Sequence, residues 1–265
     1  MIPIRDANPT RRTPWVTLAF IAVNVAVFLL WQPTFGGEGE QAGFFYCNAE
    51  IPWEISNASN LADGGAAARR AIDADSPGLG APIQAFVQRE CPDKSWLLSI
   101  FVAMFLHGGW IHIAGNMLFL WVFGNNVEDR LGRILFATFY VLGGLAATGL
   151  QLLLDAGSTI PTLGASGAIA AVLGAYLVLF PGARVTTLVF FFIITWIELP
   201  ASVVLVGWFV LQVFSGVGQL TSDVAGGVAY WAHIGGFVFG AAIVWLFLRG
   251  RRPPGPAIPS RPDYI

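Results

Sequence analysis

A serine and a histidine occur within stretches of this chain that are apolar enough to cross a lipid bilayer. Ser166 stands in Gly-Ala-Ser-Gly at 164–167, and His233 stands in Ala-His-Ile-Gly-Gly at 232–236. A polar side chain at membrane depth is costly, so it usually faces a bundle interior or a water-filled cavity. Acyl transfer by serine needs a base within hydrogen-bond reach of the hydroxyl. We therefore predict that Ser166 is a nucleophile and that His233 is its base.

Candidate donors for the oxyanion of such a reaction lie in the segment from His107 to Asn116. His112 and Asn116 are four residues apart, which places both on one face of a helix. With the backbone N–H of Ser166 they would form an oxyanion hole, in which one donor lowers the barrier by about 3–4 kcal/mol. No Asp or Glu in the apolar spans is placed to orient His233. The prediction is therefore a dyad, not a triad.

Each of these residues also has a plainer interpretation. A serine in a Gly/Ala-rich span often only packs helices, and an intramembrane histidine can serve interhelical hydrogen bonding. Zinc binding by His107, His112 and His233 is a further alternative. However, His107 and His112 are five residues apart and point to different faces of a helix, with no carboxylate or thiol nearby. We therefore expect no metal and no cofactor, and we interpret His107 as structural.

Membrane spans are the elements that must position these side chains. Hydrophobic residues make up 55% of the 265 residues, charged residues 11%, and the mean hydropathy is +0.67, as in a polytopic membrane protein. The net charge of −2, without a cluster of Lys and Arg, excludes a nucleic-acid partner. Helical spans need about 20 apolar residues. Six segments qualify: 14–32, 109–124, 134–154, 161–180, 200–218 and 227–248.

The distribution of basic residues predicts the orientation. Six spans put both termini on one side, and ten arginines fall on that side, which the positive-inside rule makes cytoplasmic. We therefore expect a plasma (inner) membrane protein whose active site opens to the extracytoplasmic side. The first apolar stretch lacks a small-residue cleavage pattern, so it is interpreted as an anchor, with a signal peptide as the alternative. The ten arginines are Arg5, Arg11, Arg12, Arg130, Arg133, Arg184, Arg249, Arg251, Arg252 and Arg261.

The segments outside the spans carry further predictions. Residues 1–13 form a cytoplasmic segment before the domain 14–250, and the Pro-rich residues 251–265 form a disordered cytoplasmic tail. Val185 to Ile197 is apolar but only 13 residues long before Glu198, so we expect an interfacial or re-entrant connection. The alternative is a long tilted helix kinked at Pro200.

The long first loop, 33–108, is predicted to lie outside the membrane. It holds the two cysteines of the chain, Cys47 and Cys91. Disulfides persist in oxidising compartments, so a bridge between them is plausible, with two unpaired thiols as the alternative. Residues 96–106 are apolar and are expected to form an interfacial helix.

Small residues would let the two helices that carry the dyad approach closely. Small side chains at helix interfaces allow close backbone packing in membranes. Such packing is the physical route to a Ser–His contact. The glycines concerned are Gly164, Gly167 and Gly174 in the fourth span, and Gly235, Gly236 and Gly240 in the sixth.

The chain resembles the rhomboid family of intramembrane serine proteases from about Leu97 to Leu248. The resemblance rests on four motifs: His107 to Asn116, Glu128-Asp-Arg130-Leu-Gly, Gly164-Ala-Ser166-Gly167, and Ala232-His233 followed by Gly236 and Gly240. It implies an all-α bundle of six transmembrane helices, with Ser166 and His233 as catalytic dyad and His112, Asn116 and the Ser166 amide as oxyanion hole. It also implies that Glu128 and Arg130 tie down a cytoplasmic loop, and that transmembrane proteins are the substrates.

Two positions depart from the pattern of this family. Many members have Trp-Arg in the first loop, where this chain has Trp96-Leu97. A bacterial type has a tyrosine four residues after the serine, stacking on the histidine, where this chain has Ala170. The segments 96–106 and 185–199 are expected to border substrate access. The alternative functions are a catalytically silent relative that binds membrane clients and, less in keeping with the few ionisable residues in the spans, a transporter or channel.

Overall fold

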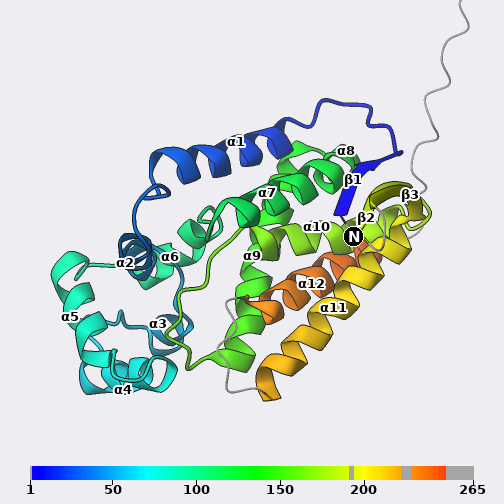
Figure 1. Cartoon of the computed structure of the whole chain (residues 1–265). Coiled ribbons are helices and arrows are strands. Elements are labelled where there is room, and N and C mark those ends of the chain that lie inside the picture. Colours follow the sequence, from blue (N-terminus) through cyan, green and yellow to red (C-terminus); the bar gives the residue numbers. More distant parts are fainter. Residues whose placement is uncertain (1, 191–193, 222–227, 249–265) are drawn as a thin grey trace, which may run out of the picture.

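The computed structural model describes residues 2–190, 194–221 and 228–248, and it is mostly helical (Figure 1). The tail 251–265, predicted to be disordered, lies outside the described residues. The helices are α1 (Trp15–Leu30), α2 (Glu38–Asn48), α3 (Pro52–Asn57), α4 (Gly65–Asp75), α5 (Gly80–Glu90), α6 (Trp96–Ala103), α7 (Trp110–Phe119), α8 (Asn125–Leu131), α9 (Arg133–Asp155), α10 (Ser166–Leu179), α11 (Ala201–Thr221) and α12 (Tyr230–Leu248). A π-helical turn, Leu120–Gly124, joins α7 to α8 without a break.

The helix α10 lies at the centre of the bundle, packed between α9 and α12, with α7 and α11 around them (Figure 1). Every residue of α10 from Gly167 to Tyr176 is buried. The contact of α10 with α12 is made by backbone. A Cβ atom added at Gly240 would lie 1.9 Å from the carbonyl oxygen of Ala171, and one at Gly236 would lie 2.1 Å from that of Gly167. These two glycines therefore permit an approach that alanine would forbid.

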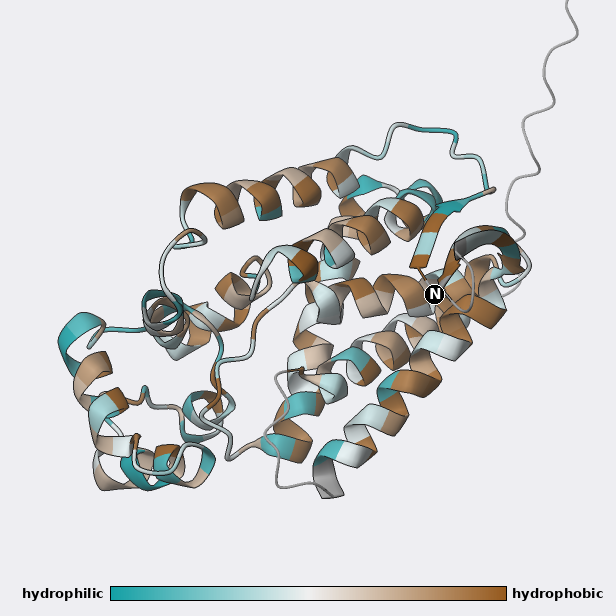
Figure 2. Cartoon of the chain, viewed as in Figure 1, coloured by the Kyte–Doolittle hydropathy of each residue, from teal (hydrophilic) through white to brown (hydrophobic). Residues whose placement is uncertain are grey.

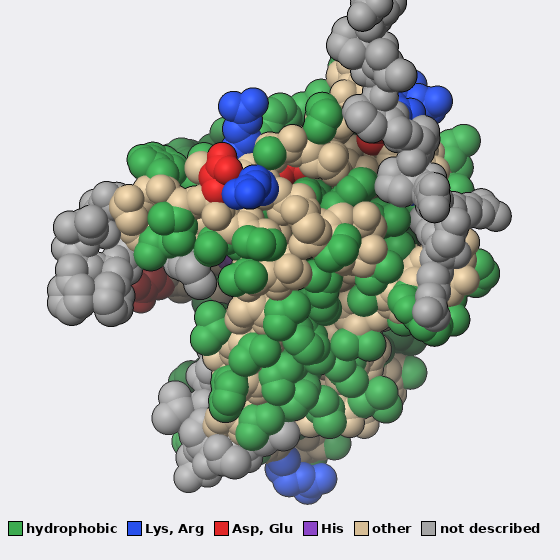
Figure 3. Space-filling view, turned by 90° about the vertical axis from the view of Figure 1, so that its right-hand side faces the viewer, with side chains coloured by type: hydrophobic (Ala, Val, Ile, Leu, Met, Phe, Trp, Pro, Cys, Tyr) green, Lys and Arg blue, Asp and Glu red, His purple; other side chains and the backbone are tan. Residues whose placement is uncertain are grey.

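Within the described ranges, three helices are long and apolar enough to cross a membrane: α9, Ala201–Gln219 of α11, and Tyr230–Phe247 of α12. The apolar helices α1 and α10 are shorter. Each of the six predicted spans contains a helix, and three of these helices meet the length and composition of a span. Hydrophobic side chains fill the middle of the face in Figure 3, while the charged side chains lie toward its margins. The chain is a multi-pass membrane protein, because such a surface is stable only in lipid.

A three-stranded antiparallel sheet corrects the prediction of an all-α fold. Strand β1 (Ile2–Asp6) pairs with β2 (Arg184–Phe190), which pairs with β3 (Ile194–Pro200). The stretch 185–197, expected to be interfacial, re-entrant or helical, is therefore largely strand. Its β-branched and aromatic residues suit a pleated surface, and β1 satisfies one edge of the hairpin.

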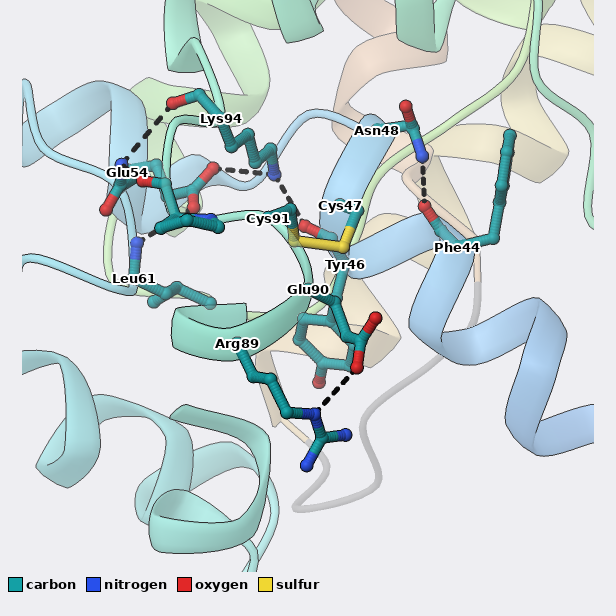
Figure 4. Close-up of a disulfide and its surroundings, with 12 residues drawn as sticks. Phe44, Tyr46, Cys47, Asn48, Glu54, Leu61, Arg89, Glu90, Cys91 and Lys94 are labelled. Atoms are coloured by element: carbon teal, nitrogen blue, oxygen red, sulfur yellow. Dashed lines mark hydrogen bonds and ion pairs between the residues drawn. A yellow bond between two sulfur atoms is a disulfide. The ribbon is translucent and has the colours of Figure 1, made fainter. Parts of the chain in front are cut away.

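The stretch 33–95 was expected to be a loop, but it folds into four helices, α2–α5, set to one side of the bundle (Figures 1 and 2). We call residues 33–95 the bridged subdomain, because a disulfide joins Cys47 to Cys91 (Figure 4). Its helices are short, between 6 and 11 residues, which hid them in the sequence. They bury a small core of their own: Ile51, Trp53, Leu61, Ala62, Ala68, Ile72 and Val87.

Candidate active site

Ser166 occupies the first turn of α10, where a helix leaves backbone N–H groups without intrahelical partners. The chain reaches this position through Gly164, whose φ of +128° suits glycine. The N–H of Gly164 donates to the carbonyl oxygen of Ala103 at the end of α6 (2.9 Å), and the N–H of Thr162 donates to that of Glu50 (2.7 Å). The segment that presents Ser166 is thus fixed from both α6 and the bridged subdomain.

His233 lies in the first turn of α12 and contacts the serine directly. Its Nε2 atom is 2.8 Å from Oγ of Ser166. The contact follows from the close approach of α10 and α12, because Gly236, one turn further along α12, packs against the backbone of Gly167. A serine hydroxyl at this distance can give its proton to an unprotonated imidazole nitrogen.

Helix α11 supplies two contacts to His233 that the sequence did not predict. Oε1 of Gln212 lies 2.8 Å from Nδ1 of His233. The ring of Trp208 lies 5.8 Å from the imidazole, centroid to centroid, at an interplanar angle of 36°. The prediction of a dyad rested on the lack of a suitably placed Asp or Glu in the spans, so it did not include Gln212. The signal that would have found it is an amide side chain within an otherwise apolar span.

His112 is held so that one nitrogen faces the serine. The backbone N–H of Gly108 donates to Nδ1 of His112 (3.2 Å), which leaves Nε2 as the nitrogen that carries a hydrogen. A Cβ atom added at Gly164 would lie 2.9 Å from this Nε2 and 3.4 Å from Oγ of Ser166. The space in front of Gly164 is therefore within reach of both a nucleophile and a donor, as a reacting carbonyl requires.

Asn116 lies one turn after His112 on α7 and is buried, 8% exposed. Its Nδ2 atom has no hydrogen-bond partner within the described chain. A buried donor without a partner is expensive and calls for an explanation. A developing oxyanion would supply the missing acceptor.

His107 is fully buried and serves as a support. The side chain of Gln32 brackets its backbone: Oε1 of Gln32 accepts from the His107 N–H (2.8 Å), and Nε2 donates to the His107 carbonyl (2.6 Å). The imidazole of His107 packs against that of His112, with ring centroids 5.1 Å apart. Among the described residues, no group of three or more His, Cys, Asp or Glu side chains could hold a metal ion.

Two cavities adjoin the site. A cavity of about 40 Å³ lies beside Ser166 and is lined mostly by small residues, including Ala103, Gly144 and Ala147, with Glu50 among them. Oε2 of Glu50 accepts from the Thr148 hydroxyl (2.9 Å), and burial raises the pKa of Glu50 to about 7. A second cavity, of about 150 Å³, has polar walls and reaches His112. Its polar lining residues are Gln151, Asp155, Ser158, Thr162 and Gln219.

The motif Glu128-Asp-Arg130 after the second predicted span lies at the far end of the bundle from Ser166. Oε1 of Glu128 accepts from the N–H of Val16 (3.0 Å), and Oε2 accepts from the N–H (2.7 Å) and hydroxyl (2.8 Å) of Thr17. Glu128 therefore caps the N-terminus of α1, a helix without a side-chain cap of its own. Arg130 lies in the last turn of the same short helix, α8.

The segments expected to border substrate access lie at opposite ends of the bundle. Helix α6 is next to the site, since Ile100, Ala103 and Met104 line the cavity beside Ser166. The hairpin β2–β3 follows the C-terminal end of α10, whereas Ser166 opens its N-terminal end, a separation of about 20 Å along 14 residues. The expectation for 185–199 is therefore wrong, because α10 separates the hairpin from the serine.

Comparison with known proteins gives one consistent result. A model of the Rhomboid domain matches residues 94–250 of this chain. Rhomboid protein 1, mitochondrial, from Saccharomyces cerevisiae is 32% identical over 161 residues, which cover 56% of this chain and 41% of that protein. Presenilin-associated rhomboid-like protein A, mitochondrial, from Danio rerio is 31% identical over 161 residues, which cover 57% and 37%.

A longer match extends beyond the Rhomboid domain. RHOMBOID-like protein 4 from Arabidopsis thaliana is 28% identical over 241 residues, covering 89% of this chain and 53% of that protein. The chain thus spans about half the length, or less, of these curated relatives.

The expected plasma-membrane location is contradicted by these relatives. The yeast and zebrafish proteins are both mitochondrial by name, which points away from a plasma membrane. The assignment of a cytoplasmic and an extracytoplasmic side falls with it. The physical reason is that an uneven distribution of arginines distinguishes the two sides of a membrane but does not identify the membrane.

Proposed function

Because this chain belongs to the rhomboid family, with the Rhomboid domain over residues 94–250, we propose that it is an intramembrane serine endopeptidase that cleaves transmembrane segments of membrane proteins. The observation that carries the proposal is the 2.8 Å contact between Oγ of Ser166 and Nε2 of His233. Rhomboid proteins generally are serine proteases of this kind, acting on membrane protein substrates.

The first half of the reaction forms an acyl-enzyme. Oγ of Ser166 attacks the scissile carbonyl carbon while Nε2 of His233 takes the hydroxyl proton. The carbonyl oxygen becomes an oxyanion that accepts hydrogen bonds from His112, Asn116 and the backbone N–H of Ser166. The N-terminal end of the α10 dipole adds to this stabilisation. The C–N bond then breaks as His233 gives the proton to the leaving amine.

The second half of the reaction hydrolyses the ester on Ser166. Water attacks the acyl carbon as His233 again takes a proton, and Ser166 leaves as the restored hydroxyl. The polar cavity of about 150 Å³ beside His112 supports a supply of water from this end of the bundle. The substrate helix must unwind here, because its hydrogen-bonded backbone otherwise hides the scissile carbonyl. Helix-breaking residues in the substrate should therefore favour cleavage.

The cavity beside Ser166 supports a preference for small side chains at the cleavage site. Its volume is only about 40 Å³, and most of its lining residues are small. We therefore expect a side chain of the size of alanine to be accepted here more readily than an aromatic one.

Labelling with a fluorophosphonate tests the proposal on detergent-solubilised protein. The native chain should be labelled and should cut a model transmembrane substrate, while Ser166→Ala and His233→Ala should do neither. A folded native chain that is neither labelled nor active would overturn the proposal in favour of a silent relative that binds membrane clients. Thermal unfolding of all three proteins checks that the variants are folded.

A further inference from the structure

Gln212 is placed to control the protonation pattern of the catalytic imidazole. Its Oε1 atom lies 2.8 Å from Nδ1 of His233, and Oγ of Ser166 lies 2.8 Å from Nε2. In this arrangement the Gln212 amide presents its oxygen, which accepts, so the hydrogen is placed on Nδ1. Neutral imidazole has one N–H, which leaves Nε2 with a lone pair toward the serine. This tautomer is the one a general base requires.

The same helix also fixes the plane of the ring. Trp208 and Gln212 are four residues apart on α11 and therefore share one face. Trp208 covers the imidazole at a tilt of 36°, and Tyr230 meets it edge-on at 90°. From α10 the corresponding position, one turn after Ser166, offers only the methyl group of Ala170, which is buried beneath α12. The ring is therefore oriented by α11 together with Tyr230 at the start of α12, not by the helix of the nucleophile.

A neutral amide suits this depth better than a carboxylate. Burying an ionised Asp or Glu inside a membrane bundle costs free energy, and a neutral imidazole has no opposite charge to offset that cost. Glutamine accepts from Nδ1–H without burying a charge. It consequently stabilises the imidazolium formed during the reaction less than a carboxylate would.

We propose that Gln212 is a positioning residue that holds His233 in the tautomer and rotamer needed to take the Ser166 proton, so that the dyad functions as a Ser–His–Gln arrangement. This inference rests on the proposed proteolytic function. It assigns a catalytic contribution to α11, which otherwise contacts the bundle less extensively than α9, α10 and α12 contact one another.

The decisive comparison is between Gln212→Met and Gln212→Glu. Methionine has a similar length but lacks the strong acceptor, so kcat should fall about 10- to 100-fold, part of the 10²–10⁴ that general base catalysis supplies, with KM unchanged. Glutamate restores the acceptor and adds charge. It should retain more activity than methionine and shift the acidic limb of the kcat/KM profile to higher pH, because a carboxylate stabilises the imidazolium.

A control variant separates positioning from helix packing. Leu211 is 62% exposed on the same helix, so Leu211→Met should leave kcat and the pH profile unchanged. Native kcat in Gln212→Met would overturn the proposal. The proposal would also be overturned if Gln212→Glu lost as much activity as Gln212→Met and its pH profile showed no shift of the acidic limb. Gln212 would then have a packing role only.

The tautomer of His233 gives a readout that does not depend on activity. The chain has three histidines, so ¹⁵N-histidine spectra of the full protein in micelles can be assigned with His→Gln variants. The native protein should show a protonated Nδ1 at His233, and Gln212→Met should lose it. If the native chain shows this tautomer but cleaves nothing, the proposed protease function fails while the role of Gln212 stands. If the chain cleaves but His233 carries its hydrogen on Nε2, the role of Gln212 fails alone.

Discussion

The membrane bundle and the bridged subdomain are stabilised in opposite ways. In the bundle, α10 and α12 touch through backbone at glycines. In the bridged subdomain, a disulfide and an ion pair between Lys94 and Glu54 (2.7 Å) reinforce a core of only seven residues (Figure 4). The side chains of Lys94 and Glu54 are almost fully buried. The difference follows from size and solvent. A segment with so small a core cannot bury enough apolar surface, so it needs covalent and ionic reinforcement.

The two regions meet at Ser166. The segment before Ser166 is held by the bridged subdomain through Thr162 on Glu50, and through the N–H and hydroxyl of Thr159 on Asp75 (2.5 and 2.8 Å). The bundle carries the side chains of Ser166 and His233, whereas the subdomain supports the backbone that precedes Ser166. Mutations in the two regions should therefore have different signatures.

The largest effect is expected in the bundle, from Gly240→Ala. The new Cβ would meet the Ala171 carbonyl at 1.9 Å, and a backbone atom cannot turn away. Overpacking costs about 1–3 kcal/mol where side chains can adjust, and here the two helices must part. We expect loss of folded protein and of fluorophosphonate labelling. Gly149→Ala on α9, where a Cβ meets nothing within 4 Å, is the matched control and should be neutral or stabilising.

Removal of the disulfide should affect the bridged subdomain first. Cys47 and Cys91 are 44 residues apart, and closing a loop of that length contributes about 4 kcal/mol in the chain-entropy account. Cys47→Ser with Cys91→Ser should make α2–α5 sensitive to limited proteolysis while the bundle stays protected. Reduction of the native protein should give the same pattern. Simultaneous loss of protection in both regions would show that they unfold as one unit.

Breaking the buried ion pair should cost slightly less. Lys94 donates to the Tyr46 carbonyl (2.9 Å) as well as pairing with Glu54, whose Oε1 accepts from the N–H of Leu61 (2.9 Å). Lys94→Met strands a buried carboxylate, so the free energy of unfolding should fall by about 3 kcal/mol. The double variant with Glu54→Gln should recover part of this loss. Arg89→Met in the exposed pair with Glu90 should change stability by less than about 1 kcal/mol.

Glu50 should make stability depend on pH. Burial raises its pKa from 4.5 to about 7, so between these values the folded protein binds a proton that the unfolded chain does not. The contribution of Glu50 to stability therefore falls as pH rises from 4.5 to 7, by at most about 3 kcal/mol. Unfolding temperatures at pH 5 and pH 8 measure this slope. Glu50→Gln should flatten it, whereas Glu38→Gln at an exposed position should not.

The parts of this molecule that the sequence revealed are those where chemistry restricts the residue type. Ser166, His233 and the glycines of α12 stand in motifs because the roles expected of them, nucleophile, base and backbone contact, tolerate few substitutes, and the family that they indicated is confirmed. Gln212 went unnoticed because a single amide in an apolar helix forms no motif. The strands of the connection 185–199 went unpredicted because their partner strand, Ile2–Asp6, lies about 180 residues away. Short helices in a Gly/Ala-rich stretch have too few turns for a periodic signal, so the bridged subdomain looked like a loop.

The sheet also bears on the position of His233. β1 is hydrogen-bonded to β2, β2 to β3, and β3 ends at Pro200, immediately before α11 begins at Ala201. Gln212 follows about 16 Å further along this helix. Residues 2–6 are thus linked to Gln212, and through it to the imidazole of His233, by the paired strands and by α11. We expect a tag fused to β1 that disturbs this pairing to change the position of α11, and with it the contact of Gln212 to His233.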